Sequence, residues 1–395
     1  MIKDAETILK DKIHHPNIQY SQTYTDMVGF PIYLKPENLQ KTGSYKIRGA
    51  YNKLRTLTQE ERDRGVLTAS AGNHAQGLAL AAKMLGIKAT VFMPKTAPLA
   101  KVEATKGYGA NIVSSGNNFD ETTKEALEWQ KEHNALFISP FNDDYIIAGQ
   151  GTVGLEILEE CPNVDTIIVP VGGGGVISGI CLAVKTLRPD VRIIGVQAKG
   201  SSAMYNSFHS GQLSSIKTSD TIADGINVKE PAQRTFDIVE KYVTDFVTVD
   251  DEETSQAMLY LLERSKLVVE PSGAVGLAAI INKKVNLTGT TVILISGGNV
   301  DIKMIDNIVQ RGLVKSGRYL KFITMISDLP GSLYKLLGLL YELNASIINI
   351  EHDRLRSNLK IGQTEVEISI ETKNREHNEH ILSELKNSGY EVRTI

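Results

Sequence analysis

The sequence predicts an α/β protein in two parts, a large body with mostly parallel sheets and a small C-terminal body of βαββαβ order. Two observations support this prediction. From residue 30 to about 315, short apolar runs of strand length alternate with amphipathic stretches of helical period. Near residue 316 the pattern changes to strands that have one polar and one apolar face. The alternation in the first part indicates parallel sheets, because each crossover between parallel strands carries a helix.

The large part contains a series of candidate strands in chain order. They are PIYLKPE, GVLTAS, KATVFMP, ANIVSS, TIIVPV, RIIGVQA, DFVTVD and TVILIS. Between them lie helical stretches such as HAQGLALAAKMLG, NFDETTKEALEWQKEHN and ETSQAMLYLLERSK. Ligands in such sheets bind where the carboxyl ends of the strands meet loops and helix N-termini. The functional residues are therefore expected at those turns.

The small part begins with a strand in KSGRYLKFITMISDLPGS and a turn at Pro330 and Gly331. In the helix that follows, one buried face has the i, i+3, i+4, i+7 spacing, formed by Leu333, Leu336, Leu337 and Leu340. ASIINIEHDR and GQTEVEISIETK read as strands, and the alternation in the second predicts one buried and one wet face. A charged helix, EHNEHILSELKNSG, and a short strand, YEVRTI, complete an order that suits a ferredoxin-like domain.

Composition argues against several classes of protein. The 395 residues carry 43 Lys and Arg against 46 Asp and Glu, a net charge of −3, whereas a nucleic-acid binder usually carries a basic surplus. Cys161 and Cys181 cannot form a disulfide framework and lack the spacing of a zinc site. The N-terminus MIKDAETILKDKI has no apolar signal core, and the longest apolar runs are too short to span a bilayer. The sequence predicts a cytoplasmic protein without nucleic-acid or membrane partners.

The clearest local signal is the glycine run in VPVGGGGVISG, residues 169–179. Glycines let backbone amides approach an anion, and the N-terminus of the following helix adds positive potential. The alternative is a tight turn, but a turn does not require the backbone entropy that four glycines cost. The dinucleotide fingerprint fails because Ile177 or Ser178 stands at its last position, and the P-loop fails because Ile180 replaces lysine. The sequence thus predicts a phosphate, without the marks of a nucleotide, on Gly172, Gly173, Gly174 and Gly175.

Other turns carry polar residues whose chemistry stays open on the residues alone. SAGNHAQG (70–77) begins a helix whose free N–H groups could hold a carboxylate, although its Ser or Asn alone is as often a helix cap. In SGGN, Ser296 follows a buried strand and could point toward a ligand or form only a turn. Glu270 in EPSGAVGLAAI could be a cap. Residue chemistry alone does not distinguish Lys46, in GSYKIRGAYNKL, from the other lysines.

The segments SYKIRG, SAGNHAQ, VGGGG, EPSGA and SGGN, in this order and spacing, resemble the fold-type II pyridoxal-phosphate (PLP) enzymes. These enzymes have a tryptophan synthase β-like fold of two subdomains. The chain most resembles the threonine dehydratases (threonine ammonia-lyases), with serine dehydratase and serine racemase as near relatives. The resemblance implies a catalytic domain over 1–315 with a smaller subdomain inserted at about 47–145. Separately, SDLPGSLYKLLGLLYELNASIINIEHDR resembles the ACT domain, which implies a regulatory module over 318–395.

The resemblance implies a role for each motif. Lys46 would form the Schiff base with PLP and remove the α-proton of the substrate, which requires a neutral amine of lowered pKa. The glycine loop would hold the cofactor phosphate, and Asn73 would contact the hydroxyl of the pyridine ring. Ser296 would face the pyridine nitrogen, where a neutral serine makes the ring a weaker electron sink than an aspartate does. The substrate carboxylate would lie on the turn formed by Ser70, Ala71, Gly72 and Asn73.

The implied reaction converts L-threonine to 2-oxobutanoate and ammonia, and also L-serine to pyruvate. An L-serine dehydratase or a serine racemase-like enzyme is the alternative. Racemisation is disfavoured, because serine racemases carry a second serine where this chain has Ala71, which has no proton to give. Gln197 stands where those relatives place a metal-binding glutamate, so no divalent metal site is predicted, and a monovalent cation held by backbone carbonyls stays open. Two other classes are a nucleotide-dependent oxidoreductase and a non-catalytic amino-acid sensor.

The ACT resemblance implies a homo-oligomer, a dimer or a tetramer, because these domains pair across subunits and bind amino acids at the seam. It assigns contacts with an amino-acid effector to Leu329, Pro330, Gly331 and Asn344. Inhibition by isoleucine with valine as antagonist is the expected regulation, since 2-oxobutanoate feeds isoleucine synthesis. The alternative is a module that only holds subunits together. The preference for threonine or serine, and a biosynthetic or catabolic role, do not follow from the sequence.

Overall fold

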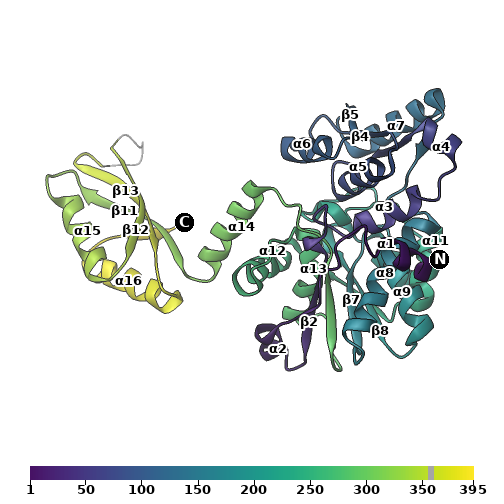
Figure 1. Cartoon of the computed structure of the whole chain (residues 1–395). Helices are drawn as coiled ribbons and strands as arrows, with labels where there is room; N and C mark the ends of the chain where they lie inside the picture. Colours follow the sequence, from purple (N-terminus) through teal and green to yellow (C-terminus); the bar gives the residue numbers. More distant parts are fainter. Residues whose placement is uncertain (355–359) are drawn as a thin grey trace. The chain divides into compact units, whose positions relative to one another are not determined.

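The computed structural model describes residues 1–354 and 360–395 and divides into two compact units, Met1–Asp301 and Ile302–Ile395 (Figure 1). Helix α14 (Ile302–Lys315) opens the second unit. The sequence-based limits at residues 315 and 318 differ from this division by the length of that helix.

The first unit contains a six-stranded sheet of order β1–β2–β10–β7–β8–β9. Its first strand pairs antiparallel with the second, and all other pairs are parallel. The strands are β1 (Gln19–Tyr20), β2 (Ile32–Pro36), β7 (Thr166–Pro170), β8 (Arg192–Ala198), β9 (Asp245–Val249) and β10 (Thr291–Ile295). The predicted parallel α/β construction is confirmed, and only the short antiparallel β1 in this sheet was not predicted.

A second sheet in the same unit has four parallel strands in the order β5–β4–β3–β6. They are β3 (Val66–Ala69), β4 (Ala89–Met93), β5 (Asn111–Ser114) and β6 (Leu136–Phe137), and the two-residue β6 was not predicted. Helices α5 (Asn73–Leu85), α6 (Leu99–Gly107) and α7 (Phe119–His133) alternate with these strands along the chain (Figure 1). The limits of the smaller subdomain expected at 47–145 stay a prediction.

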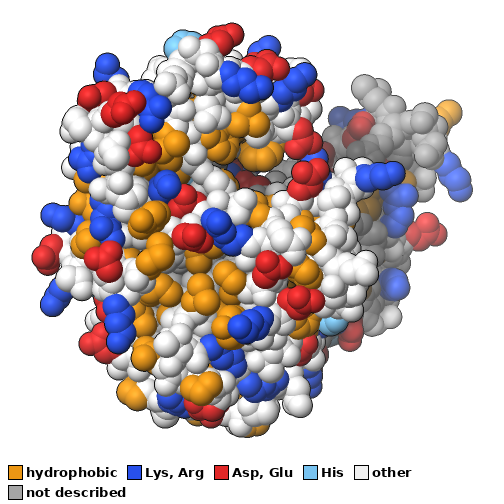
Figure 2. All heavy atoms as spheres, turned by 90° about the vertical axis from the view of Figure 1, so that its right-hand side faces the viewer, with side chains coloured by type: hydrophobic (Ala, Val, Ile, Leu, Met, Phe, Trp, Pro, Cys, Tyr) orange, Lys and Arg blue, Asp and Glu red, His pale blue; other side chains and the backbone are white. Residues whose placement is uncertain are grey.

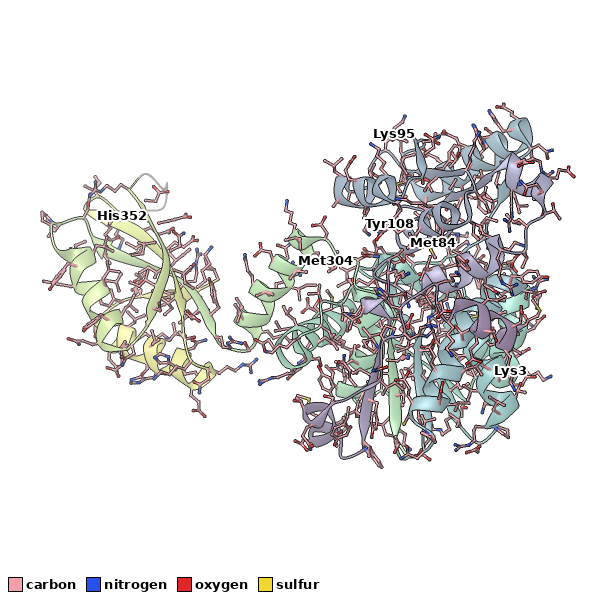
Figure 3. The ribbon with its side chains drawn as sticks, in the orientation of Figure 1. Lys3, Met84, Lys95, Tyr108, Met304 and His352 are labelled. Atoms are coloured by element: carbon pink, nitrogen blue, oxygen red, sulfur yellow. The ribbon has the colours of Figure 1, made fainter. Side chains whose placement is uncertain are left out.

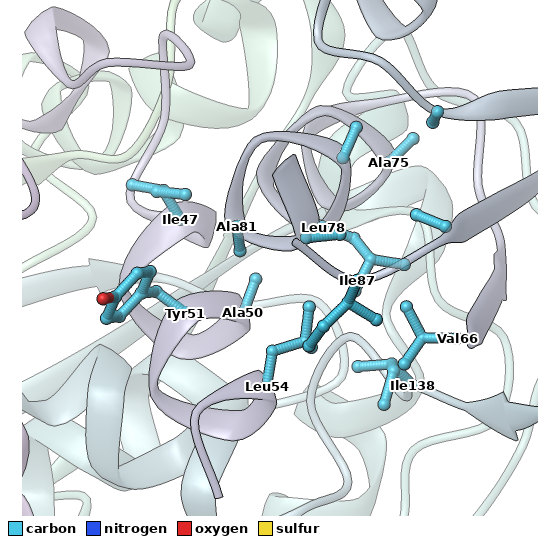
Figure 4. Close-up of a cluster of buried hydrophobic side chains, with 14 of the residues drawn as sticks. Ile47, Ala50, Tyr51, Leu54, Val66, Ala75, Leu78, Ala81, Ile87 and Ile138 are labelled. Carbon is cyan, nitrogen blue, oxygen red and sulfur yellow. The ribbon is translucent and has the colours of Figure 1, made fainter. Parts of the chain in front are cut away.

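Helix α3 (Lys46–Leu54) lies in the core of the first unit, between α5 and α8 (Asp144–Glu160). Its buried residues Ile47, Ala50 and Leu54 belong to the same apolar cluster as Leu78 of α5 (Figure 4). Glycines in α5 and α8 allow these two helices to approach α3 closely. A Cβ on Gly77 would lie 3.0 Å from the Lys46 carbonyl carbon, and one on Gly149 would lie 2.4 Å from the Arg48 carbonyl oxygen.

The first unit contains further helices, which lie along the chain before and between the strands of its two sheets. They are α1 (Ile2–Leu9), α2 (Gln22–Val28), α4 (Gln59–Arg64), α9 (Gly175–Leu187), α10 (Ala203–Ser210), α11 (Gln233–Tyr242), α12 (Asp251–Tyr260) and α13 (Pro271–Ile281). Short 3-10 turns occur at Glu37–Leu39, Lys199–Ser201 and Asp224–Ile226, and a π-turn at Leu261–Ser265 follows α12.

The second unit confirms the predicted βαββαβ order. After α14 come β11 (Tyr319–Ser327), α15 (Ser332–Glu342), β12 (Ser346–Asp353), β13 (Gln363–Glu371), α16 (Arg375–Asn387) and β14 (Val392–Thr394). The strands form an antiparallel sheet of order β12–β13–β11–β14. The expected alternation in β13 buries Val366, Ile368 and Ile370, but Glu365, expected on the wet face, is buried as well.

On the face seen in Figure 2, Lys and Arg side chains are interspersed with Asp and Glu side chains, as expected for a net charge of −3. Over residues 1–354 and 360–395, the helices include none with both the length and the apolar character needed to cross a bilayer.

Candidate active site

Two of the predicted motifs leave adjacent parallel strands at the same edge of the six-stranded sheet. The glycine loop follows β7, and the SGGN turn follows β10, which pairs with β7. The EPSGA segment lies against the SGGN turn, because the Glu270 N–H donates to the Gly297 carbonyl oxygen at 3.1 Å. Carboxyl ends of adjacent parallel strands are the usual position of a ligand site in α/β proteins.

Lys46 is the first residue of α3 and is half-buried. Its Nζ donates to the Pro140 carbonyl oxygen at 3.2 Å and lies 5.2 Å from the centre of the Tyr45 ring. Burial lowers the pKa of Lys46 to about 8, against an opposing attraction from the Glu270 carboxylate. Because desolvation disfavours the charged form, the neutral amine is accessible near physiological pH.

Backbone hydrogen bonds hold the segment before Lys46 against the SGGN turn. The Tyr45 N–H donates to the Ser296 carbonyl oxygen at 3.2 Å, and the Gly298 N–H donates to the Gly43 carbonyl oxygen at 2.8 Å. Gly43 has a φ of +69°, a conformation that favours glycine. Tyr108, at the end of α6, donates from its hydroxyl to the Lys41 carbonyl oxygen at 3.3 Å (Figure 3). These contacts fix Lys46 beside Ser296.

A buried ion-pair cluster supports α3 two residues beyond Lys46. The Arg48 guanidinium is fully buried and donates to both carboxylate oxygens of Glu37, at 2.8 and 2.7 Å. It also donates to Glu156 at 2.9 Å, and the Lys35 Nζ lies 2.8 Å from the same carboxylate. Burial alone would raise the pKa of Glu156, but Arg48 beside it holds that pKa well below its usual range. Paired donors and acceptors make this cluster a rigid base for the helix that carries Lys46.

Asn73 is the centre of a chain of side-chain hydrogen bonds. Its Nδ2 donates to Glu270 Oε1 at 2.6 Å, and its Oδ1 accepts from Asn299 Nδ2 at 2.7 Å. Asn299 Nδ2 also donates to the Thr42 carbonyl oxygen at 2.7 Å. Burial, together with the nearby Asp224 carboxylate, raises the pKa of Glu270 to about 7. The sequence offered Glu270 only as a helix cap and did not single out Asn299.

The glycine loop has the geometry of an anion cradle. Gly174 has a φ of +87° and immediately precedes α9. A Cβ on Gly173 would lie 2.4 Å from Cδ1 of the Phe141 ring, so only glycine fits at this position. Within residues 1–354 and 360–395, no hydrogen bond uses the N–H groups of Gly172, Gly173 or Gly174. Free N–H groups at a helix N-terminus fit a phosphate.

Buried hydroxyls surround the SGGN turn. Ser296 is 4% exposed, and its Oγ reaches its best acceptor, the Ser272 carbonyl oxygen, only at 3.5 Å. The hydroxyls of Ser44 and Ser272 are also buried, with no hydrogen-bond partner in the part of the chain that the structure describes. Because buried polar groups are rarely left unpaired, this arrangement fits a polar ligand such as a ring nitrogen.

The segment Asp224–Ile226 completes the site and was not predicted. A Cβ on Gly172 would lie 3.0 Å from the Ile226 Cα, and a Cβ on Gly225 would lie 2.9 Å from Ser272 Oγ. Asp224 also forms an ion pair with Lys101 of α6, so the segment connects the six-stranded sheet to the helices of the second sheet. The only feature of the sequence that pointed to this segment was Gly225, which lies in a long stretch without helical or strand period.

Within the second unit, the residues expected to contact an effector lie at opposite ends of one helix. Leu329, Pro330 and Gly331 precede α15 and Asn344 follows it, so a helix of 11 residues, about 16 Å long, separates them within one chain.

Gln197 is buried, and its Oε1 accepts from the Tyr205 N–H at 2.9 Å. Among the described residues, no group of three or more His, Cys, Asp or Glu is arranged to hold a metal.

Comparisons with known proteins agree on one family. The family model described as "Pyridoxal-phosphate dependent enzyme" matches residues 12–297. The L-threonine ammonia-lyase of Thermotoga maritima is 48% identical over 395 residues, covering 100% of this chain and 98% of that protein. The L-threonine ammonia-lyase of Geobacter sulfurreducens is 46% identical over 393 residues, covering 99% and 98%. The solved structure of maize serine racemase has a TM-score of 0.75 at 38% identity and covers 80% of this chain and 97% of that one.

Proposed function

The chain belongs to the pyridoxal-phosphate dependent enzymes, and from that premise we propose that it converts L-threonine to 2-oxobutanoate and ammonia. The predicted resemblance to this enzyme family is thereby confirmed. L-Serine, which lacks only one methyl group, is the second proposed substrate, giving pyruvate and ammonia. Two relatives named L-threonine ammonia-lyase, which match essentially the whole chain, support the choice of reaction. The observation that carries the proposal is the Lys46 amine, whose pKa burial lowers to about 8, held between two of the motifs. The amine donates to the Pro140 carbonyl oxygen, next to the Phe141 ring that packs on Gly173, and the preceding residue Tyr45 is bonded to Ser296.

The residues present fit PLP. Its phosphate would accept hydrogen bonds from the free N–H groups of Gly172, Gly173 and Gly174, since these amides end at a helix N-terminus. Its ring hydroxyl would accept from Asn73, and its ring nitrogen would face the weakly bonded hydroxyl of Ser296. When bound through Lys46, PLP supplies an electron-withdrawing ring that stabilises negative charge on the substrate α-carbon.

The chain's own residues would bind the substrate and move its protons. The half-buried turn from Ser70 to Asn73 would hold the substrate carboxylate, because backbone N–H groups at the start of α5 favour an anion. The Lys46 Nζ, in its neutral form, would take the α-proton as a general base. Loss of the β-hydroxyl as water is balanced by addition of water when ammonia leaves, so the net products are a 2-oxo acid and ammonia.

Serine racemisation is the second candidate, because maize serine racemase is among the similar solved structures. Racemisation requires a second proton donor on the opposite face of the substrate α-carbon. The proposed donor position in this chain is Ala71, whose methyl group has no exchangeable proton. We therefore expect little or no D-serine from L-serine.

The test is 2-oxo acid formation from L-threonine and L-serine by the purified PLP-loaded enzyme, with D-serine measured in parallel. Lys46→Ala should lose turnover of both substrates. Lys53→Ala is the matched control, because Lys53 lies on the same helix but pairs with Asp143. Turnover retained in Lys46→Ala would refute the role of Lys46. Turnover absent from the wild type, despite bound cofactor, would refute the reaction.

The second unit is proposed as an ACT module that pairs with a second copy in a cytoplasmic homo-oligomer. Its edge strand β12 is exposed along most of its length, including the apolar Ile347 and Ile348, which supports pairing across subunits. We expect isoleucine to inhibit and valine to relieve inhibition. Threonine kinetics that stay unchanged across both titrations would leave the unit a purely structural role.

A further inference from the structure

Glu270 occupies a helix N-cap position without capping the helix. It precedes Pro271, the first residue of α13, and its side chain makes no hydrogen bond to the N–H groups of that helix. The residue is only 3% exposed. Its Oε1 instead accepts from Asn73 Nδ2 at 2.6 Å, a contact that joins residues 197 positions apart. A buried carboxylate with such a contact has a role other than starting a helix.

The direction of each hydrogen bond around Asn73 is fixed by its neighbours. The Thr42 carbonyl oxygen can only accept, so the Asn299 atom 2.7 Å away from it must be the amide nitrogen. That nitrogen uses its second hydrogen on the Asn73 oxygen, at 2.7 Å. The Asn73 nitrogen therefore faces Glu270, and one of its two hydrogens remains for another acceptor.

Gly297 leaves the room that this contact needs. A Cβ on Gly297 would lie 2.4 Å from Glu270 Oε1 and 3.1 Å from Asn73 Nδ2. Any side chain at this position of the SGGN turn would push the two groups apart. The turn, the carboxylate and the amide thus form one packed arrangement at the place where three separate segments meet.

We propose that Glu270 is a positioning residue, whose carboxylate holds the Asn73 amide with its free N–H directed at the ring hydroxyl of the cofactor. The inference rests on the proposed function, in which Asn73 contacts that hydroxyl. The Glu270 Oε1 atom is the acceptor in this bond, so it keeps the amide nitrogen of Asn73 on its own side. A donated hydrogen bond stabilises the negative charge of the ring oxygen, and it is stronger because the acceptor is charged.

Two substitutions separate the hydrogen bond from the charge. Glu270→Ala removes the acceptor and the charge, whereas Glu270→Gln keeps an acceptor oxygen of the same reach and removes only the charge. Asp237→Asn is the control. It removes an exposed carboxylate charge on α11 that accepts a hydrogen bond from Gln233 and not from Asn73. All proteins keep Lys46 and are studied as the full chain loaded with PLP.

The readouts are the absorption spectrum of the bound cofactor and its dissociation constant. Bound PLP with an anionic ring oxygen absorbs in the visible range, and the form with a neutral hydroxyl absorbs in the near ultraviolet. Glu270→Ala should shift absorption toward the ultraviolet band and raise the dissociation constant at least about tenfold. Glu270→Gln should stay within about threefold of the wild type, since a neutral acceptor retains most of such a bond. Asp237→Asn should match the wild type, because that carboxylate does not contact Asn73.

Two results would overturn the inference. One is Glu270→Gln as impaired as Glu270→Ala, which would make the charge responsible. The other is a normal spectrum and affinity in Glu270→Ala. If Glu270→Ala does not fold, Asn299→Ala tests the other end of the chain and should shift the spectrum in the same direction. The spectra do not depend on the amino acid turned over, so a failure of threonine turnover with the expected spectral pattern refutes the proposed reaction alone.

Discussion

Replacement of Gly173 by alanine is expected to displace the glycine loop and weaken cofactor binding. The new Cβ would lie 2.4 Å from Cδ1 of the Phe141 ring, whereas ordinary contact begins at 3.4 Å, a shortfall of 3.4 − 2.4 = 1.0 Å. Phe141 as a whole is held close to the loop, because its Cβ and Cα would lie 2.9 and 3.0 Å from a Cβ on Gly175. The displacement therefore falls largely on the loop.

The magnitude follows from the geometry of hydrogen bonds to the phosphate. An N–H···O bond of about 2.9 Å lengthened by about 1 Å is no longer a hydrogen bond. Loss of one bond to a charged acceptor costs about 1.5–3 kcal/mol. At 1.36 kcal/mol for each factor of ten, the dissociation constant of PLP should rise about 10- to 150-fold.

The assay is titration of the cofactor-free protein with PLP, followed by visible absorption. Phe141→Ala combined with Gly173→Ala should recover much of the lost affinity, because removal of the ring removes the clash. Gly107→Ala is the control, since a Cβ there meets no atom within 4 Å. Wild-type affinity in Gly173→Ala, or a double variant that binds no better than the single one, would refute the reasoning.

Three further predictions concern buried groups. Arg48→Met leaves the buried Glu37 carboxylate without its ion-pair partner and removes one of the partners of Glu156, which keeps Lys35. It should lower the free energy of unfolding in urea by about 3–5 kcal/mol, with a smaller deficit at acidic pH, where those carboxyls bind protons. The pKa of Lys46 is about 8 in the folded cofactor-free protein against 10.5 as the ordinary value, so the unfolded state holds more protons between these pH values. Stability should therefore rise with pH from about 8 to 10.5 in the wild type and less in Lys46→Met, measured by urea unfolding at each pH. Gly297→Ala should reproduce the spectral shift of Glu270→Ala, because its Cβ would displace that carboxylate; an unshifted spectrum would contradict the packing argument.

The strands were predictable where their apolar runs were long. Strands β7 and β10 are buried at every residue, and each appears in the sequence as a continuous apolar run. β1 and β6 have two residues each, which is too short for any periodicity. Their pairing depends on neighbouring strands rather than on their own side chains.

Lys46 was predictable only from the order of several motifs. Its chemistry depends on burial and on partners far along the chain, since Pro140 accepts from its amine and Glu270 influences its pKa. No local pattern around a lysine records such contacts. Without the accompanying glycine loop and SGGN turn, the residue would have been one lysine among many.

Glycines and charged partners differ in how much the sequence reveals about them. A run of glycines is visible because no ordinary helix or strand requires it, so the loop at Gly172 to Gly175 indicated a close approach of backbone to ligand before any fold was known. Glu270 is a common residue at a common position, the residue before a helix that begins with proline. Its side chain could have capped that helix, and only the meeting of α13, α5 and the SGGN turn directs it to Asn73 instead. The sequence thus reveals where the backbone needs glycine. The partner of a buried carboxylate, in contrast, is decided by packing between segments that are distant in the chain.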